Sequence, residues 1–167
     1  DAGKRLVKRC NELGIMVDLS HLNEAGFWDV AKTSQHPLVA THSNVHANTP
    51  SARNLTDKQL DAIKDSQGVV GLNFHVGFLN PEGRREPELT GVSIMADHLD
   101  YLIEKLGDDK VGLGSDFDGA TMPNDLRDAS LQQNLLTAMR ERGYDEATLR
   151  KIAYGNWLRV LEKTWGE

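Results

Sequence analysis

Short runs of apolar residues alternate with longer amphipathic stretches along this chain of 167 residues. Four runs are predominantly apolar and as short as buried strands: 15–20, 38–41, 69–74 and the start of 111–119, a segment that ends in the carboxylates Asp116 and Asp118 beside Gly119. The stretches between them repeat apolar residues at helical spacing. Because an alternation of strands and helices is typical of a parallel sheet with helical crossovers, we predict an α/β fold.

Capping signals mark the expected helices. Asn23 can cap one of them, and Thr56 with Gln59 has the form of a capping box. The helices are expected over 2–13, 23–31, 56–68, 92–106, 126–140 and 145–163. A complete (β/α)8 barrel takes about 250 residues, and four strands do not close one. We therefore predict that residues 1–167 form a single partial domain, the C-terminal half of a TIM-like barrel with about four parallel strands and flanking helices.

The composition excludes several classes of protein. Lys and Arg number 19 against 25 Asp and Glu, a net charge of −6, and the basic residues do not cluster, so no nucleic-acid partner is expected. The single cysteine, Cys10, rules out an intrachain disulfide. No apolar run approaches the roughly 20 residues of a membrane-spanning helix. We expect no membrane contact from this chain and favour the cytoplasm as its location.

Chemically active side chains follow the predicted strands. His21, His42 and His75 come directly after the first three apolar runs, and Asp116 and Asp118 follow the fourth. Since the carboxyl ends of parallel strands lie on one face, these side chains should lie near one another. Imidazoles at neighbouring strand ends can bind one metal ion, or each can simply hydrogen-bond a loop. Asp116 could be a ligand or a general base, whereas Asp118 is better suited to capping a helix.

The loop after His42 supplies a further candidate. Residues 43–54 form a long polar connection at the same end of the sheet, where functional residues tend to lie. Arg53, near the end of this loop, could hold a substrate carboxylate through two hydrogen bonds, or it could form a surface ion pair. His75 is expected to be a neutral hydrogen-bonding residue. His98, inside a helix, is expected either to support a metal ligand through a hydrogen bond or to be buried with its hydrogen bonds satisfied.

Several ordered motifs resemble the membrane dipeptidase (renal dipeptidase) family. The matching segments are GIMVDLSH at 14–21, ATHS at 40–43, RN at 53–54, ADHLDY at 96–101, VGLGSDFDG at 111–119 and GNWLRV at 155–160. The resemblance extends from residue 1 to about residue 165. It implies a binuclear zinc enzyme on an α/β barrel that hydrolyses dipeptides, often with a D-residue at the carboxyl end.

The resemblance also assigns expected roles to individual residues. His21 and His42 match the two histidines that bind the second zinc. Asp116 matches the acid that takes the proton of the zinc-bridging water and passes it to the leaving amine. Arg53 matches the arginine that holds the substrate carboxylate. Phe78 lies where many members have a tyrosine, so one hydrogen bond to the substrate is expected to be missing.

Other parts of the family's site have no counterpart in this chain. These are the His-x-Asp zinc pair of the first strand, the glutamate that bridges both metals, and a further histidine that stabilises the tetrahedral intermediate. Of the two zinc sites of the complete enzyme, at most one is therefore expected to be partly formed here. We expect a partner that completes the barrel, either the missing N-terminal half or another copy in a homo-oligomer.

The sequence thus predicts a zinc-dependent dipeptidase that hydrolyses a dipeptide by a metal-activated water, with the isolated chain incomplete for catalysis. One alternative is a non-catalytic half-barrel that binds a metal or a partner. A second alternative is another amidohydrolase, acting on non-peptide amides or lactones through the same metal geometry.

Overall fold

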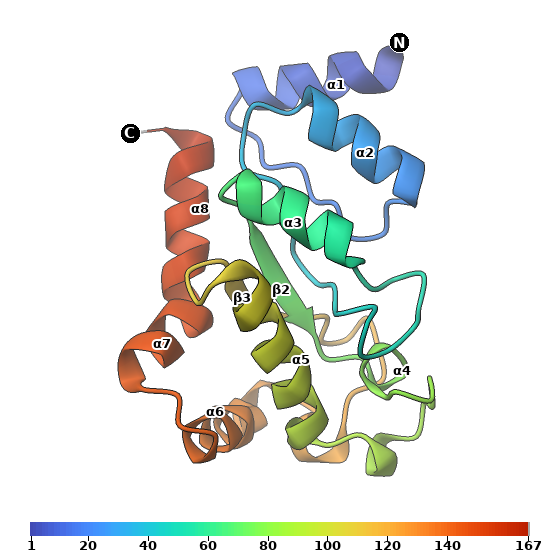
Figure 1. The fold of residues 1–167 in the computed structure, drawn as a ribbon, viewed down its shortest axis with the longest axis vertical. Coiled ribbons are helices and arrows are strands. Elements are labelled where there is room, and N and C mark those ends of the chain that lie inside the picture. The colour runs from blue at the N-terminus through green and yellow to red at the C-terminus, as the bar shows by residue number, and fades with distance from the viewer. Residues whose placement is uncertain (167) are drawn as a thin grey trace.

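The computed structural model describes residues 1–166 and has an α/β architecture (Figure 1). Within these residues, one parallel sheet contains three strands in the spatial order β1-β2-β3. The strands are β1 (Val39–Ala40), β2 (Val69–Asn73) and β3 (Val111–Ser115). In the central strand β2, Val69 pairs with Val39 and Val70 pairs with Val111. The predicted fold class and the parallel direction of the strands are confirmed.

Helices precede, connect and follow the strands. They are α1 (Ala2–Glu12), α2 (Glu24–Thr33), α3 (Asp57–Asp65), α4 (Val76–Leu79), α5 (Val92–Leu106), α6 (Gln132–Glu141), α7 (Glu146–Arg150) and α8 (Asn156–Trp165), with a π-helical turn (Lys151–Gly155) between the last two. The predicted caps are confirmed: Asn23 Oδ1 accepts from Gly26 N at 2.8 Å, and Thr56 and Gln59 form a capping box. In the described part of the chain, no helix has the length and apolar composition needed to cross a bilayer.

The helix predicted over 126–140 begins later than expected. Two 3₁₀ turns, Asn124–Leu126 and Ala129–Leu131, precede α6. The Asp128 carboxylate accepts a hydrogen bond from the backbone N–H of Ser130 at 2.9 Å. Such a local side-chain contact offers the backbone an alternative to the α-helix, which explains the delayed start.

The predicted strand over 15–20 is reduced to a single parallel bridge, between Asp18 and Val39. Leu19 N donates to Val39 O at 2.8 Å, but the N–H of Thr41, the residue directly after β1, donates to the Asp18 side chain at 3.0 Å. The carboxylate thus takes the donor that a longer ladder would have used for a backbone carbonyl. The expectation of about four strands is corrected to three strands and this bridge.

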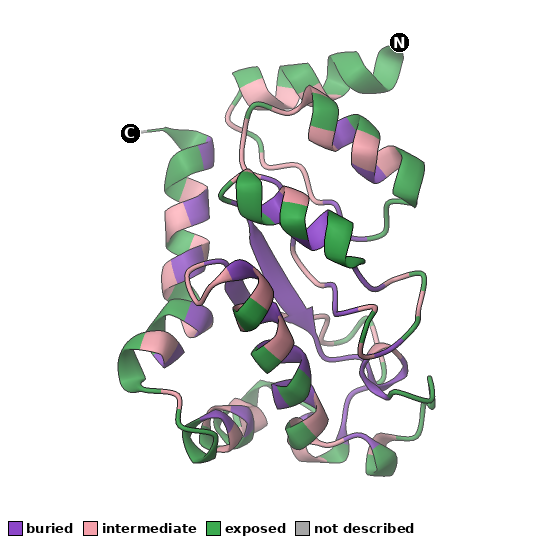
Figure 2. Cartoon of the chain, viewed as in Figure 1, coloured by how far each residue is buried: buried purple, intermediate pink, exposed green. Residues whose placement is uncertain are grey.

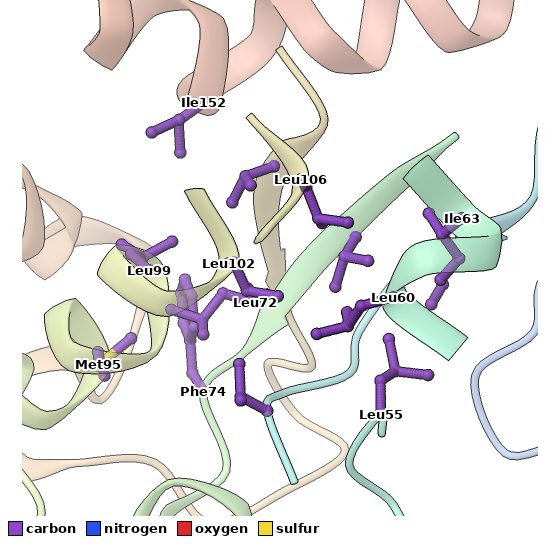
Figure 3. Close-up of a cluster of buried hydrophobic side chains, with 14 of the residues drawn as sticks. Leu55, Leu60, Ile63, Leu72, Phe74, Met95, Leu99, Leu102, Leu106 and Ile152 are labelled. Carbon is purple, nitrogen blue, oxygen red and sulfur yellow. The ribbon is translucent and has the colours of Figure 1, made fainter. Parts of the chain in front are cut away.

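One face of the sheet packs against α3 and α5. Alternate residues of β2 meet apolar side chains from both helices in one buried cluster (Figure 3). The labelled members in Figure 3 are Leu55, Leu60, Ile63, Leu72, Phe74, Met95, Leu99, Leu102, Leu106 and Ile152. Figure 2 shows the same division, with buried residues on β2 and on the sheet-facing sides of both helices. Because burying one such side chain is worth roughly 1.5–3 kcal/mol, this cluster is the main source of stability.

The opposite face of the sheet meets α8. Val160 packs against Val39 and Val69 at the amino-terminal end of the strands. Further along the strands, glycine leaves room for the Trp157 indole, since a Cβ at Gly112 would lie 2.6 Å from its Nε1 atom. The carboxyl ends of the strands extend beyond this helix, and the polar residues gather there.

Candidate active site

The structure brings His21 and His42 together at the carboxyl end of the sheet. His21 follows the Asp18 bridge, and His42 follows β1. Their Nε2 atoms lie 2.9 Å apart, and the centroids of their rings lie 5.0 Å apart. His21 is exposed and His42 is half-buried. The two imidazoles lie 21 residues apart in the sequence, yet their Nε2 atoms point toward one another.

Hydrogen bonds join the two histidine-bearing segments. Asp18 Oδ1 accepts from the backbone N–H groups of Ser20 and Thr41, at 2.9 and 3.0 Å. Asp18 Oδ2 accepts from the Thr41 hydroxyl at 2.5 Å, and that hydroxyl oxygen lies 2.7 Å from His42 Nδ1. Ser20 Oγ in turn accepts from the backbone N–H of His42 at 3.0 Å. These contacts fix the backbone on either side of the imidazole pair.

Asn73, the last residue of β2, links His42 to Asp116. Its Nδ2 atom donates to Asp116 Oδ2 at 3.0 Å and to the His42 carbonyl at 3.4 Å. The Asn73 backbone is itself held by the Asn44 side chain, which bonds its N–H at 2.8 Å and its carbonyl at 2.9 Å. Since Asn73 is fully buried, this amide holds one oxygen of the Asp116 carboxylate in a fixed place.

The backbone is strained at both halves of the site. His21 and Asp116 have φ angles of 75° and 72°, in the left-handed region that L-residues rarely adopt. Ser115 and Asp118, on either side of Asp116, also have positive φ values. Each such conformation costs on the order of 1–3 kcal/mol and persists only where the surrounding structure enforces it.

Asp118 lies exposed in this turn, and no described helix starts directly after it, so the predicted helix cap there was wrong.

Arg53 and Phe78 lie together beside this cluster. The Arg53 guanidinium carbon lies 5.4 Å from the centroid of the Phe78 ring, within cation–π range. Asn54 Nδ2 donates to the Phe78 carbonyl at 2.8 Å and so joins the loop to α4. Arg53 Nη2 is buried and has no hydrogen-bond partner among the described residues. In the same residues Arg53 makes no ion pair, so the surface ion pair considered from the sequence is absent there.

Charges within the site act on one another. Burial lowers the pKa of His42 below its ordinary value, although Asp18 and Asp116 oppose the shift and Arg53 adds to it. Burial likewise lowers the pKa of Arg53, again opposed by Asp116 and Asp18. The imidazole, the guanidinium and the two carboxylates are therefore close enough to form one electrostatic unit.

Known proteins of one family match nearly the whole chain. Residues 1–165 match the family model described as membrane dipeptidase, peptidase family M19. The chain belongs to the membrane dipeptidase family. Dipeptidase tcpJ of Claviceps purpurea is 35% identical over 164 residues, which are 96% of this chain and 37% of the fungal protein.

Two solved structures are similar over nearly all of the chain. Dipeptidase AC, a metallopeptidase of family M19, is 56% identical with a TM-score of 0.98, and the match covers 100% of this chain and 49% of that one. A Rhodobacter sphaeroides metallopeptidase, solved with a phosphinate mimic of the dipeptide L-Ala-D-Ala, is 57% identical with a TM-score of 0.96, over 99% and 47% of the two chains. The chain thus spans about half the length of these structures and matches the C-terminal half of the M19 barrel.

The residues present fit part of the metal site that membership of a metallopeptidase family implies. Imidazole nitrogens are preferred zinc ligands, and the two Nε2 atoms already face one another at 2.9 Å. Two zinc-bound nitrogens lie about 3.4 Å apart when each Zn–N bond is about 2.1 Å and the angle between the bonds is tetrahedral, so a small separation of the rings would suffice. Within residues 1–166, however, no group of three or more His, Cys, Asp or Glu side chains is placed to hold a metal ion.

Other polar residues of the membrane dipeptidase motifs were not assigned a role from the sequence. Asp18 and Thr41 lie inside the matching motifs, and their proximity to the histidines was the available signal. Asn73 gave no signal, because one asparagine at the end of an apolar run is common. His75 is a hydrogen-bonding residue as expected, with Nδ1 3.0 Å from the Thr121 carbonyl oxygen.

His98 is buried with its hydrogen bonds satisfied, the second of the two roles expected from the sequence. Its Nδ1 atom accepts from the backbone N–H of Val45 at 3.2 Å, and Nε2 lies 3.1 Å from the Leu79 carbonyl. The side chain is 1% exposed, and burial lowers its pKa to about 4. His98 therefore attaches α5 to both the 43–54 loop and the end of α4, the two segments that hold Arg53 and Phe78.

Proposed function

We propose that this chain is the C-terminal half of a zinc dipeptidase, and that it supplies two ligands of the second metal, the proton-transferring acid and the substrate-carboxylate site. The observation that supports this most directly is that three groups gather at one end of the sheet: the pair of imidazoles, the Asp116 carboxylate held by Asn73, and the Arg53 guanidinium, whose buried Nη2 atom has no hydrogen-bond partner within residues 1–166. These are the groups that hydrolysis of a short peptide with a free carboxylate requires.

In this proposal His21 and His42 bind zinc through Nε2. When bound, the zinc ions would polarise the peptide carbonyl and acidify a water molecule. Asp116 lies on the same face, with Oδ2 held by Asn73. As the C–O bond forms and the C–N bond breaks, Asp116 takes the proton from water and passes it to the leaving amine nitrogen. That transfer conserves protons and leaves the carboxylate ionised for the next cycle.

Arg53 is proposed to hold the carboxylate of the substrate. A buried guanidinium N–H without a partner is costly, and a carboxylate is the ligand that satisfies it best. The Rhodobacter sphaeroides metallopeptidase was solved with a phosphinate mimic of L-Ala-D-Ala, and that dipeptide has a free carboxylate. Phe78 packs beside Arg53 and contributes an apolar wall where a tyrosine would offer a hydroxyl.

A partner that completes the barrel is also part of the proposal. Large apolar side chains at the ends of the chain are exposed, among them Leu13 at 53%, Ile15 at 49% and Trp165 at 66%. Gly14 approaches the end of α8 closely, since a Cβ there would lie 3.4 Å from Trp165 Cα, so the three form neighbouring surface. We propose that this surface and the edges of the sheet meet the N-terminal half that the longer relatives have.

The test uses a chimera that joins the N-terminal half of the 56% identical dipeptidase to this chain. Loaded with zinc, the chimera is expected to hydrolyse L-Ala-D-Ala, whereas the isolated chain is not. Asp116→Asn in the chimera should lower the turnover number about 10³-fold, within the range of general acid–base catalysis, with unchanged zinc content by elemental analysis. Asp118→Asn, in the same turn, is the matched control and should retain activity.

Each alternative function has its own outcome. Full turnover by the Asp116→Asn chimera would remove Asp116 from the mechanism. A zinc-loaded chimera that cleaves lactones or acylated amino acids but no dipeptide would favour the other amidohydrolase. A chimera that binds zinc and cleaves none of these substrates would favour the alternative in which this half-barrel binds a metal without catalysing a reaction. Only a dipeptidase should lose affinity when the substrate carboxylate, the proposed partner of Arg53, is converted to an amide.

A further inference from the structure

A continuous series of hydrogen bonds runs from Asp18 through Thr41 to His42 and ends at His21. The Asp18–Thr41 contact is 2.5 Å, the Thr41–His42 contact is 2.7 Å, and the contact between the two imidazoles is 2.9 Å. The Asp18 carboxylate is itself held by two backbone N–H groups. None of the sequence motifs assigns a role to Asp18 or Thr41.

The chemistry of each group allows one direction for these bonds. An ionised carboxylate only accepts, so the Thr41 hydroxyl must donate its single hydrogen to Asp18. The hydroxyl oxygen can then only accept from His42, which places a hydrogen on Nδ1. The Nε2 atom of the neutral His42 imidazole then carries no hydrogen. Its lone pair accepts the hydrogen bond from His21 Nε2.

We propose that Asp18 and Thr41 are positioning residues that set the tautomer and ring orientation of His42, so that its Nε2 lone pair faces His21 before any metal binds. The inference rests on the proposed function in that His42 is taken to be a zinc ligand. A neutral imidazole can offer Nε2 to a metal only when its hydrogen is on Nδ1, and histidine ligands are commonly fixed in this way by a partner on the other nitrogen.

The same reasoning distinguishes the two histidines. His42 is half-buried and is held in the ligand form by Thr41, whereas His21 is exposed and donates from the nitrogen that would have to bind the metal. His21 must therefore change tautomer when a metal ion enters. His42 would thus hold a metal ion without rearrangement, whereas His21 would first have to carry its hydrogen on Nδ1 in place of Nε2.

Nuclear magnetic resonance of the metal-free 167-residue chain tests the proposal directly. Long-range ¹H–¹⁵N correlations at pH 8, assigned with a His42→Gln variant, should show His42 with its hydrogen on Nδ1, the minor form of free histidine. Thr41→Val keeps the volume but removes the hydroxyl, and should return His42 to the Nε2–H form. Thr41→Ser is the matched control that restores a hydroxyl and should restore the wild-type tautomer.

Metal titration gives a second readout on the same proteins. Affinity for Co²⁺, followed by its visible absorption, should fall about tenfold in Thr41→Val and recover in Thr41→Ser. An Nε2–H tautomer of His42 in the wild-type chain would overturn the proposal, as would an unchanged tautomer in Thr41→Val. If the predicted tautomers are observed but neither the wild-type sequence nor Thr41→Ser binds Co²⁺ even when joined to the N-terminal half in the chimera, the proposed metal role fails while the positioning by Asp18 and Thr41 stands.

Discussion

The two sides of the central strand β2 are built on different principles. Toward α3 and α5, Leu72 of β2 and Phe74, the residue directly after the strand, join a large apolar cluster in which many side chains share the contacts. At the carboxyl end, Asn73 makes single directional hydrogen bonds to Asp116 and to the His42 carbonyl. Apolar packing is redundant and tolerant of similar residues, whereas each hydrogen bond depends on one atom of one residue.

This contrast predicts which substitutions destabilise the whole domain and which affect only the site. A core substitution should lower the stability of the whole domain while leaving the surviving native molecules with an intact site. A substitution at the carboxyl end should disturb the site at little cost in stability. The backbone strain at His21 and Asp116 fits this division, because the packed sheet can support left-handed residues at its end.

The largest effect on stability is expected for Leu102→Ala. Leu102 lies on α5, is fully buried, and contacts the cluster beneath the sheet (Figure 3). Loss of its side chain should lower the free energy of unfolding by roughly 2–5 kcal/mol, through lost burial and the cavity that remains. Urea denaturation measures this change, and Leu158→Ala, at a side chain 54% exposed on α8, is the control with little expected effect. An altered His42 tautomer in folded Leu102→Ala would show that core and site are not separable.

A somewhat smaller effect on the free energy of unfolding is expected at low pH, through protonation of His98. Its pKa is lowered to about 4 by burial, so the unfolded chain, with a pKa near 6.5, binds this proton first. The free energy of unfolding should therefore decrease as the pH falls from about 6.5 to 4 and level off below pH 4. The contribution of His98 to this decrease is about 3 kcal/mol. The measurement is the free energy of unfolding against pH in wild type and His98→Gln. The two profiles should diverge within that window, and parallel profiles would contradict the burial argument.

The same contrast explains how far the sequence could predict the structure. The helices α3 and α5 and the strands β2 and β3 were predictable because their apolar periodicity reports directly on packing. The strand expected over 15–20 was wrong because the Asp18 side chain, not a backbone carbonyl, takes the Thr41 N–H. The proximity of His21, His42 and Asp116 was predictable from their place after strands, but the contact of Asn73 with Asp116 depends on the three-dimensional structure, which no periodicity encodes.

The smallest effect on stability, with a clear effect on the site, is expected for Gly119→Ala. Gly119 is exposed, yet a Cβ there would lie 2.6 Å from Asp116 Oδ1, so the carboxylate must move. The free energy of unfolding should change by less than about 1 kcal/mol, because no buried contact is lost. Turnover of L-Ala-D-Ala by the zinc-loaded chimera should fall about tenfold, since sub-ångström placement of a proton-transferring group affects the rate strongly. Gly155→Ala, where a Cβ meets only Arg150 backbone atoms at 3.4 Å or more, is the control. Equal turnover in the two variants would mean that Asp116 does not depend on the geometry of its turn.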